Sequence, residues 1–149
     1  MATDPRLLGY LNRALGHEMA AVQQYMAQSR ICDQWGMDDY CAHFRQDVTE
    51  ELGHVQSLMD ALLRKGITPN AMQLPPVRLG RSMREMIAID HVLEVEAVRL
   101  YEEAAAYCAR VRDFEHHGLF SGILRDELTH LEELAKMEIA IGEEGKRYA

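Results

Sequence analysis

The chain contains few residues that interrupt helices. Only four of its 149 residues are proline, and three of these fall within residues 66–81. Because proline lacks a backbone N–H and clashes with the preceding helical turn, its absence elsewhere leaves long windows free to be helical. Aromatic residues make up only 7%, whereas methionine, leucine and alanine, which favour helices, are plentiful. This composition favours an all-α fold.

Cysteines and long apolar runs are also scarce. Cys32, Cys41 and Cys108 are scattered, with no Cys-x-x-Cys pair, which argues against a disulfide framework or a cysteine-based zinc site. We expect reduced, partly buried thiols. No uncharged apolar run approaches the roughly 20 residues of a membrane span, and the first residues contain no apolar signal stretch. We therefore expect one soluble, cytoplasmic domain over residues 1–149, with no membrane partner.

The net charge is −8 at pH 7. An acidic surface disfavours non-specific binding to the phosphates of nucleic acids and attracts cations. We therefore expect no nucleic-acid partner.

Two helical windows precede the proline-rich stretch. The first opens with the capping residue Asp4 and Pro5 and continues to Gln34. After a turn at residues 35–38, the second continues to Lys65 and ends at Gly66. In both windows apolar residues recur at spacings of three and four, as on a helix with one buried face. The pattern predicts a hairpin of two long helices.

Two further windows follow the proline-rich stretch. Ser82-Met83-Arg84-Glu85 is a capping box that opens a third helix, Asp113 is positioned to cap a fourth, and Gly142 is expected to end it. Residues 66–81 form a longer connection than neighbouring antiparallel helices need, so we expect them to cross the length of the bundle. Two hairpins joined by one long crossover resemble the ferritin-like four-helix bundles.

Each of the four apolar faces carries one glutamate near its middle. In the second and fourth windows a histidine follows three residues later, on the same side of the helix. These six residues are Glu18, Glu51, His54, Glu94, Glu127 and His130. Glu18 and Glu94 are 76 residues apart, and the same offset relates Glu51 to Glu127, His54 to His130, and Tyr25 to Tyr101. The two hairpins therefore match residue by residue.

Four carboxylates on dry helix faces need compensation. An ionised carboxylate in such a place costs several kcal/mol, and four in one layer also repel one another. Two divalent cations would offset the four negative charges. Carboxylate and imidazole ligands together suit iron or manganese, with zinc as a redox-silent alternative. The six residues thus predict a site for two metal ions.

Several sequence segments resemble the bacterioferritin family. They are Tyr10-Leu11-Asn12, Glu18, Gln24-Tyr25, Trp35-Gly36, Glu51-x-x-His54 and Leu124-Arg125-Asp126-Glu127-x-x-His130, and the match extends over roughly residues 7 to 142. The resemblance implies that Glu18 and His54 bind one iron, that Glu94 and His130 bind the other, and that Glu51 and Glu127 bridge them. It also implies a redox-active Tyr25 and a homo-oligomer, from a dimer up to a hollow shell.

The chain departs from this family at three places. The methionine that holds haem across a dimer axis falls at position 52, which is Leu52 here, so we expect no haem. Positions 46 and 50, an inner-surface iron site in some members, are Gln46 and Glu50. Only 19 residues follow His130, too few for the end of the fourth helix and the family's short fifth helix. A closed shell is therefore less well supported than the metal site.

The expected function is ferroxidase activity, in which two Fe(II) ions each give one electron to dioxygen or peroxide, for iron storage or detoxification. One alternative is a rubrerythrin-like peroxidase. That group typically adds a rubredoxin module and a further carboxylate on the third helix, where this chain has Ala97 and no Cys-x-x-Cys. Another is a non-storing subunit that acts with a partner protein, for example a haem-bearing subunit.

Other polar residues admit simpler interpretations. Tyr25 and Tyr101 each follow a central glutamate by seven residues, and either is close enough to take part in oxidation or simply to be a buried tyrosine. His91 falls on the third apolar face, as a packed histidine or as a support for the metal site. We assign the other histidines, and three acidic pairs, to the solvated surface: His17, His43, His116, His117, Glu102-Glu103, Glu132-Glu133 and Glu143-Glu144.

Overall fold

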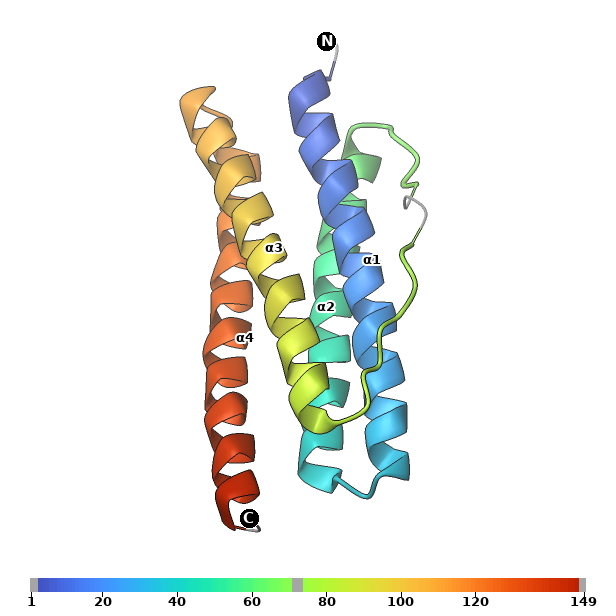
Figure 1. Ribbon diagram of the computed structural model, residues 1–149. Coiled ribbons are helices and arrows are strands. Elements are labelled where there is room, and N and C mark those ends of the chain that lie inside the picture. The colour runs from blue at the N-terminus through green and yellow to red at the C-terminus, as the bar shows by residue number, and fades with distance from the viewer. Residues whose placement is uncertain (1–2, 71–73, 148–149) are drawn as a thin grey trace.

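The protein is a bundle of four long helices, as the sequence predicts. The computed structural model describes residues 3–70 and 74–147, with side chains up to residue 144. The helices are α1 (Pro5–Gln34), α2 (Asp38–Arg64), α3 (Met83–Arg110) and α4 (Phe114–Arg147) (Figure 1). No β-strand occurs in the described residues.

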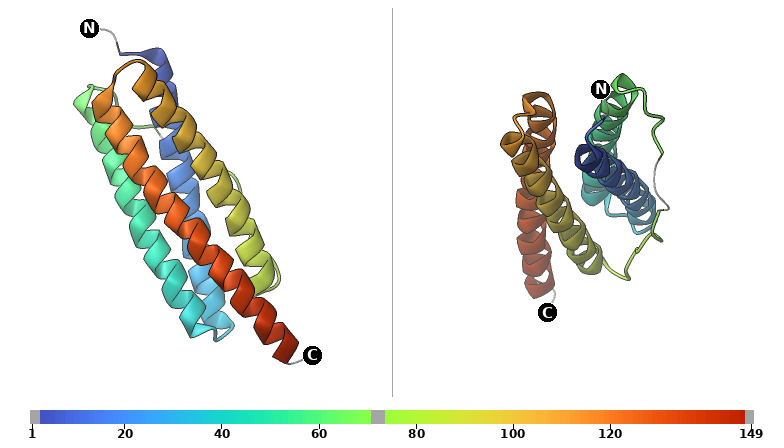
Figure 2. Two further views of the ribbon diagram at one scale, coloured as in Figure 1. Left: turned by 90° about the vertical axis from the view of Figure 1, so that its left-hand side faces the viewer. Right: turned by 90° about the horizontal axis from the view of Figure 1, so that it is seen from above.

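The helices form two hairpins. α1 packs along α2 and α3 along α4, and the hairpins meet mainly where α1 contacts α3. Seen from above, the two pairs lie side by side (Figure 2). The crossover passes along the outside of α1 to reach the start of α3 at the other end of the bundle (Figure 1). Gln24 of α1 anchors it, because its side-chain amide donates to the Arg78 carbonyl and accepts from the Arg78 N–H at 3.0 Å.

The helix starts largely follow the capping signals in the sequence. Asp4 accepts a hydrogen bond from the Arg6 N–H at the start of α1. At α3, the Glu85 N–H donates to Ser82 Oγ at 3.2 Å, but the Glu85 carboxylate accepts from the N–H of Arg81 instead of Ser82. The capping box is therefore shifted by one residue on one side.

The start of α4 was predicted correctly, but its end was not. Asp113 caps α4, because its Oδ1 accepts from the His116 N–H at 3.2 Å. Gly66, with φ of +72°, follows the end of α2 as expected. Gly142, in contrast, does not end α4, which continues to Arg147. Glycine lowers helix propensity by only about 1 kcal/mol, and the residues after it, beginning with Glu143 and Glu144, readily continue a helix.

Two apolar clusters fill the bundle. One contains Leu11, Leu15, Leu58, Leu62, Tyr101 and Phe120 among others, and the second contains Tyr25, Phe44, Met86, Ile87 and Leu134. Along every helix the central glutamate lies between the residues of the two clusters. Burial of these apolar side chains stabilises the bundle at either end of a polar layer.

The structure corrects four expectations for single residues. His91 is exposed, and its neighbour Asp90 is fully buried instead, because the buried positions of α3 pass through residues 87, 90 and 94. His116 is buried rather than on the surface, with Nδ1 2.8 Å from Asp113 Oδ2. The three cysteines are free and fully buried rather than partly buried. His43 is half-buried.

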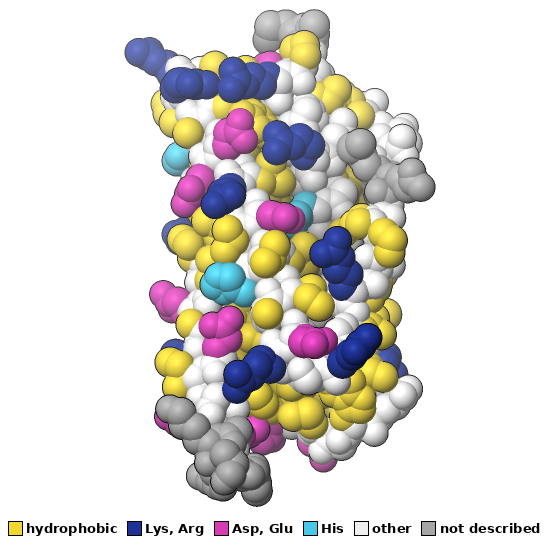
Figure 3. Space-filling model, in the orientation of Figure 1, with side chains coloured by type: hydrophobic (Ala, Val, Ile, Leu, Met, Phe, Trp, Pro, Cys, Tyr) yellow, Lys and Arg dark blue, Asp and Glu magenta, His cyan; other side chains and the backbone are white. Residues whose placement is uncertain are grey.

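The surface shows no large patch of one charge on the face drawn in Figure 3, where acidic and basic side chains alternate. Among the described residues, no helix combines the length and apolar character that crossing a bilayer requires.

Candidate metal centre

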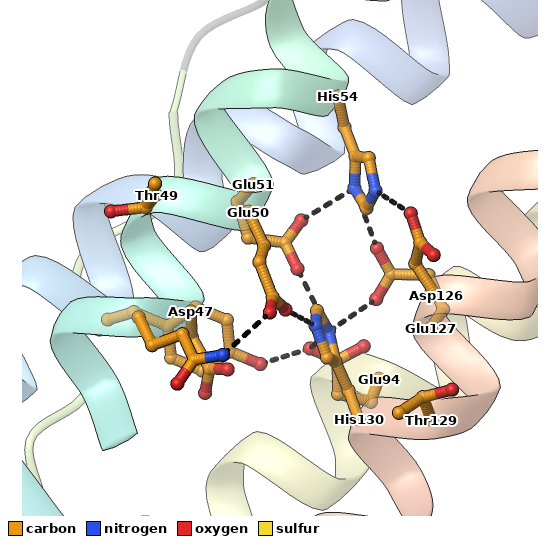
Figure 4. A network of polar contacts seen from close by, with 12 residues as sticks. Asp47, Thr49, Glu50, Glu51, His54, Glu94, Asp126, Glu127, Thr129 and His130 are labelled. Atoms are coloured by element: carbon orange, nitrogen blue, oxygen red, sulfur yellow. Dashed lines mark hydrogen bonds and ion pairs between the residues drawn. The ribbon is translucent and has the colours of Figure 1, made fainter. Parts of the chain in front are cut away.

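Six polar side chains meet in the middle of the bundle. Each helix supplies one glutamate, and α2 and α4 each add a histidine one turn later (Figure 4). All six are buried, with exposed fractions between 0% and 7%: Glu18, Glu51, His54, Glu94, Glu127 and His130. The structure thus brings together all six residues that the sequence predicts as metal ligands.

The six residues form two overlapping groups. The first is Glu18, Glu51, His54 and Glu127, and the second is Glu51, Glu94, Glu127 and His130. In each group one potential ligand atom per residue lies within 4.8 Å of all the others. Glu51 and Glu127 belong to both groups. The geometry therefore provides two adjacent cation positions with two shared carboxylates.

Each histidine turns Nδ1 toward the carboxylates. His54 Nδ1 lies 3.2 Å from Glu127 Oε1 and 3.5 Å from Glu18 Oε2. His130 Nδ1 lies 3.1 Å from Glu51 Oε1 and 3.5 Å from Glu94 Oε1. The two rings are equivalent under the 76-residue offset, so the site has approximate two-fold symmetry.

Several buried atoms of this site have no hydrogen-bond partner. They are Glu18 Oε2, Glu51 Oε1, Glu94 Oε2, Glu127 Oε1 and His130 Nδ1. Buried polar atoms are nearly always satisfied, because leaving one unpaired costs about 1–3 kcal/mol. Four carboxylate oxygens and one imidazole nitrogen, all facing a common space, are the donors that a pair of divalent cations would use. The residues present therefore fit a two-metal site.

The outer nitrogens of both histidines contact carboxylates that the sequence stage did not assign to the site. His54 Nε2 lies 2.8 Å from Asp126 Oδ2, and His130 Nε2 contacts Glu50 (Figure 4). A carboxylate that accepts the second N–H fixes the ring orientation and raises the basicity of a ligand histidine. Asp126 and Glu50 each directly precede a shared glutamate and obey the 76-residue offset, which was the available signal.

The two buried tyrosines connect the hairpins. The hydroxyl of Tyr25 on α1 donates to Glu94 on α3, and that of Tyr101 on α3 donates to Glu18 on α1 at 2.6 Å. Burial raises the pKa of both phenols, and the adjacent carboxylates raise it further. Both tyrosines therefore stay protonated and orient a terminal glutamate.

The surroundings of the tyrosines break the symmetry. Near Tyr25, Gln28 Nε2 donates to Asp90 Oδ1 at 2.6 Å, and both side chains are fully buried. The positions 76 residues away are Ala104 and Ala14. Burial raises the pKa of Asp90 well above its usual range. Sequence reasoning missed Asp90 because it placed the neighbouring His91 on the buried face.

Protons balance the charge of the metal-free site. Burial raises the pKa of Glu18 to about 8, and Glu51 adds to this effect; burial together with Glu127 raises the pKa of Glu94 to about 7. Burial alone would lower the pKa of His54 and His130, but the surrounding carboxylates outweigh it and raise both. Burial would raise the pKa of Glu127, but hydrogen bonds from Glu94 and the histidines lower it. Bound protons therefore occupy the site that cations would neutralise.

Comparison with known proteins matches this geometry to a family. The family described as Ferritin-like domain matches residues 8–138. A bacterioferritin of Rhodobacter capsulatus is 33% identical over 132 residues, covering 89% of this chain and 82% of the relative. A bacterioferritin of Mycolicibacterium paratuberculosis is 31% identical over 134 residues, covering 90% and 84%. A bacterial ferritin of Synechocystis is 30% identical over 126 residues, covering 85% and 81%. The chain, with its ferritin-like bundle and its buried layer of glutamate and histidine, belongs to the bacterioferritin family.

Proposed function

We propose that the protein is a ferroxidase that binds two Fe(II) ions as substrate and oxidises them to Fe(III), for iron storage or detoxification. The observation that carries this proposal is the buried layer of four glutamates and two histidines, with two overlapping ligand groups and unpaired polar atoms. Two adjacent Fe(II) ions supply two electrons together, so dioxygen or hydrogen peroxide can be reduced by an electron pair at one place.

Each residue has a separate role in this proposal. Glu18 and His54 hold one iron, Glu94 and His130 hold the other, and Glu51 and Glu127 contact both. Asp126 and Glu50 keep the two imidazoles turned inward. Because carboxylates can bind through one or two oxygens, the ligand set can adjust to Fe(III) while the helices stay in place.

Tyr25 is the proposed redox-active side chain. It donates its hydroxyl hydrogen bond to Glu94, a proposed ligand, and is 1% exposed. Tyr101 makes the matching contact to Glu18. The buried Gln28–Asp90 pair lies on the Tyr25 side, and Asp90 is among the charges that raise the pKa of Tyr25. This polar neighbour favours Tyr25 over Tyr101.

The test is anaerobic loading of Fe(II) into the purified full chain, followed by air. We expect ferric absorbance to develop in a fast phase that saturates at about two iron ions per chain. Glu51→Gln and Glu127→Gln should remove the fast phase, and Glu102→Gln, on an exposed position of α3, serves as the control. A helical, folded protein that shows no ferric absorbance would refute the proposal.

A peroxide-specific reaction is the second candidate, because both buried tyrosines contact proposed ligands, as in the rubrerythrin-like alternative. Ala97, however, is buried and provides no additional carboxylate on α3. Oxidation rates measured side by side with hydrogen peroxide and dioxygen separate the two reactions. A rate that is high only with peroxide would favour the peroxidase.

We further propose that the chain works as a homo-oligomer, at least a dimer, in keeping with its family. Leu52, at the family's haem-ligand position, is 41% exposed on α2, open to a partner subunit. Light scattering, before and after iron loading, measures the assembly. A dimer that accumulates no ferric mineral would favour a non-storing subunit that acts with a partner, for example a haem-bearing one.

A further inference from the structure

A second group of metal-ligand side chains lies beside the proposed dinuclear centre. His43 and Asp47 of α2 and Glu133 of α4 each offer an atom within 4.8 Å of the others. His43 Nε2 lies 3.1 Å from Asp47 Oδ2, across one helical turn. Asp47 is only 4% exposed, and His43 and Glu133 are half-buried. None of the three belongs to the six residues of the dinuclear centre.

The bundle itself does not require polar residues at these places. The 76-residue offset relates His43 to Leu119, Asp47 to Ile123 and Glu133 to Ser57. Ile123 is as deeply buried as Asp47, at 4% exposed, and belongs to an apolar core cluster. A buried carboxylate at a position where the other hairpin packs an isoleucine is costly unless something positive accompanies it.

One histidine does not supply enough positive charge. Asp47 and Glu133 together carry two negative charges, so a protonated His43 still leaves one uncompensated. Burial lowers the pKa of His43, but Asp47 and Glu133 outweigh both burial and the nearby His130 and raise it. Glu50 adds a third carboxylate, because Asp47, Glu50 and His130 also have ligand atoms within 4.8 Å of one another. The surroundings of Asp47 are thus strongly negative.

The group is continuous with the dinuclear centre. Asp47 belongs both to the His43–Glu133 group and to the group with Glu50 and His130. Glu50 in turn contacts His130 Nε2, the outer nitrogen of a proposed ligand (Figure 4). Polar ligand atoms therefore extend from the half-buried His43 and Glu133 to the buried centre between α2 and α4.

We propose that His43, Asp47 and Glu133 form a third divalent-cation site, which binds Fe(II) or a similar ion such as Co(II) through one imidazole and two carboxylates. Water can complete the ligand set, because two of the three residues are partly exposed. This site passes iron between the surface and the dinuclear centre. The transfer role rests on the proposed ferroxidase function, whereas the binding site itself does not.

Crystals of the full chain saturated with Co(II) test the binding site by anomalous scattering. We expect three cobalt positions per chain in the wild type. His43→Ala and Glu133→Gln should each lose only the position at this group, and His91→Ala, which changes an exposed histidine of α3, should keep all three. The two remaining cobalt positions show that the variants are folded.

The outcomes separate this proposal from the ferroxidase proposal. Wild-type crystals without cobalt at His43, Asp47 and Glu133 would overturn the third site, whatever the dinuclear centre binds. Cobalt at the third site alone would support the third site and count against the dinuclear centre.

The transfer role is tested by stopped-flow Fe(II) oxidation at subsaturating iron. Loss of a ligand should weaken cation binding at this site at least about tenfold, by analogy with losses at metal-supporting residues. We therefore expect His43→Ala to slow iron delivery several-fold while the ferric amplitude at saturating iron stays unchanged. An unchanged rate would overturn the transfer role, and a lost amplitude in the wild type would instead refute the ferroxidase function.

Discussion

Single side chains control the proposed centre mainly through the orientation of two imidazole rings. In each ring Nδ1 faces the carboxylates and Nε2 faces outward, toward Asp126 for His54 and toward Glu50 for His130. A ring that rotated away would remove its nitrogen from the cation position. The outer carboxylates therefore influence metal affinity without being ligands.

Asp126→Asn is expected to weaken binding at the His54 position by about 10–100-fold, because an amide oxygen accepts the imidazole N–H less strongly than a carboxylate. The Asp126 side chain is 60% exposed, so the fold should not change. Anaerobic Co(II) titration of the full chain measures the affinity, with the exposed Asp60→Asn on α2 as a control. Equal affinities for the two variants would show that Asp126 does not support His54.

The two tyrosines differ by their surroundings, not by their contacts with glutamate. Tyr25→Phe and Tyr101→Phe each keep the ring and remove one hydrogen bond to a buried glutamate, so each should destabilise the metal-free protein by about 1–3 kcal/mol. Only Tyr25→Phe is expected to slow Fe(II) oxidation and remove a tyrosyl radical signal in electron paramagnetic resonance. Equal kinetic effects of the two variants would contradict the assignment of Tyr25.

The individual helices are specified largely by their own ends and faces. Ser82 and Asp113 cap α3 and α4, and the side chain of Gln24 holds the crossover against α1. These contacts determine where α3 begins and therefore the height at which Glu94 enters the polar layer. Local capping thus helps to align the four glutamates.

Removal of the α3 cap should measure this contribution. Ser82→Ala removes the oxygen that accepts the Glu85 N–H and should cost about 1 kcal/mol, or roughly 2–4 °C in melting temperature for a chain of this size. Ser57→Ala is the matched control, because Ser57 is an exposed residue inside α2 whose hydroxyl donates to the Gly53 carbonyl. Thermal unfolding followed by circular dichroism should show little change for Ser57→Ala; equal losses would argue against the cap.

The whole molecule combines a stable apolar core with a strained polar centre. Apolar clusters lie on both sides of a layer whose carboxylates and imidazoles are charged or neutral according to the protons they hold. Because cations and protons compete for the same atoms, metal loading and pH should affect stability in opposite ways.

The metal-free protein is expected to lose stability as the pH rises from 5 to 8. Folding raises the pKa of Glu18 from 4.5 to about 8 and of Glu94 to about 7, and it raises both site histidines above 6.5. A raised pKa means that the folded state binds more protons across this range, so its stabilising contribution is complete at low pH and declines as the pH rises.

The Zn(II)-loaded protein should show the opposite trend. Zinc binds the deprotonated ligands, so the increase in melting temperature on adding zinc should grow over the same pH range. Calorimetry of metal-free and zinc-loaded samples at several pH values gives both curves. A melting temperature of the metal-free protein that rises steadily from pH 5 to 8 would contradict the proton-balanced centre.

The repeating faces of single helices explain what could be predicted before the structure. The helix ends at Asp4, Gly66 and Ser82 depend on neighbours within a few residues, and the six proposed ligands share periodicity and a 76-residue offset. Contacts between helices were less accessible. His91 was placed on the buried face instead of Asp90, and His43 and Glu133 were assigned to solvent, because a small rotation of a helix changes which neighbouring position is buried.

By itself, the sequence determined the all-α class, the long crossover and the glutamate and histidine positions, because helical periodicity and capping are local properties of the chain. Only the tertiary structure decided that Tyr25 and Tyr101 reach glutamates of the opposite hairpin, that Asp126 and Glu50 hold the histidine rings, and that Asp47 meets Glu133. These pairings depend on how four helices pack at a particular height and rotation, which no single helix specifies.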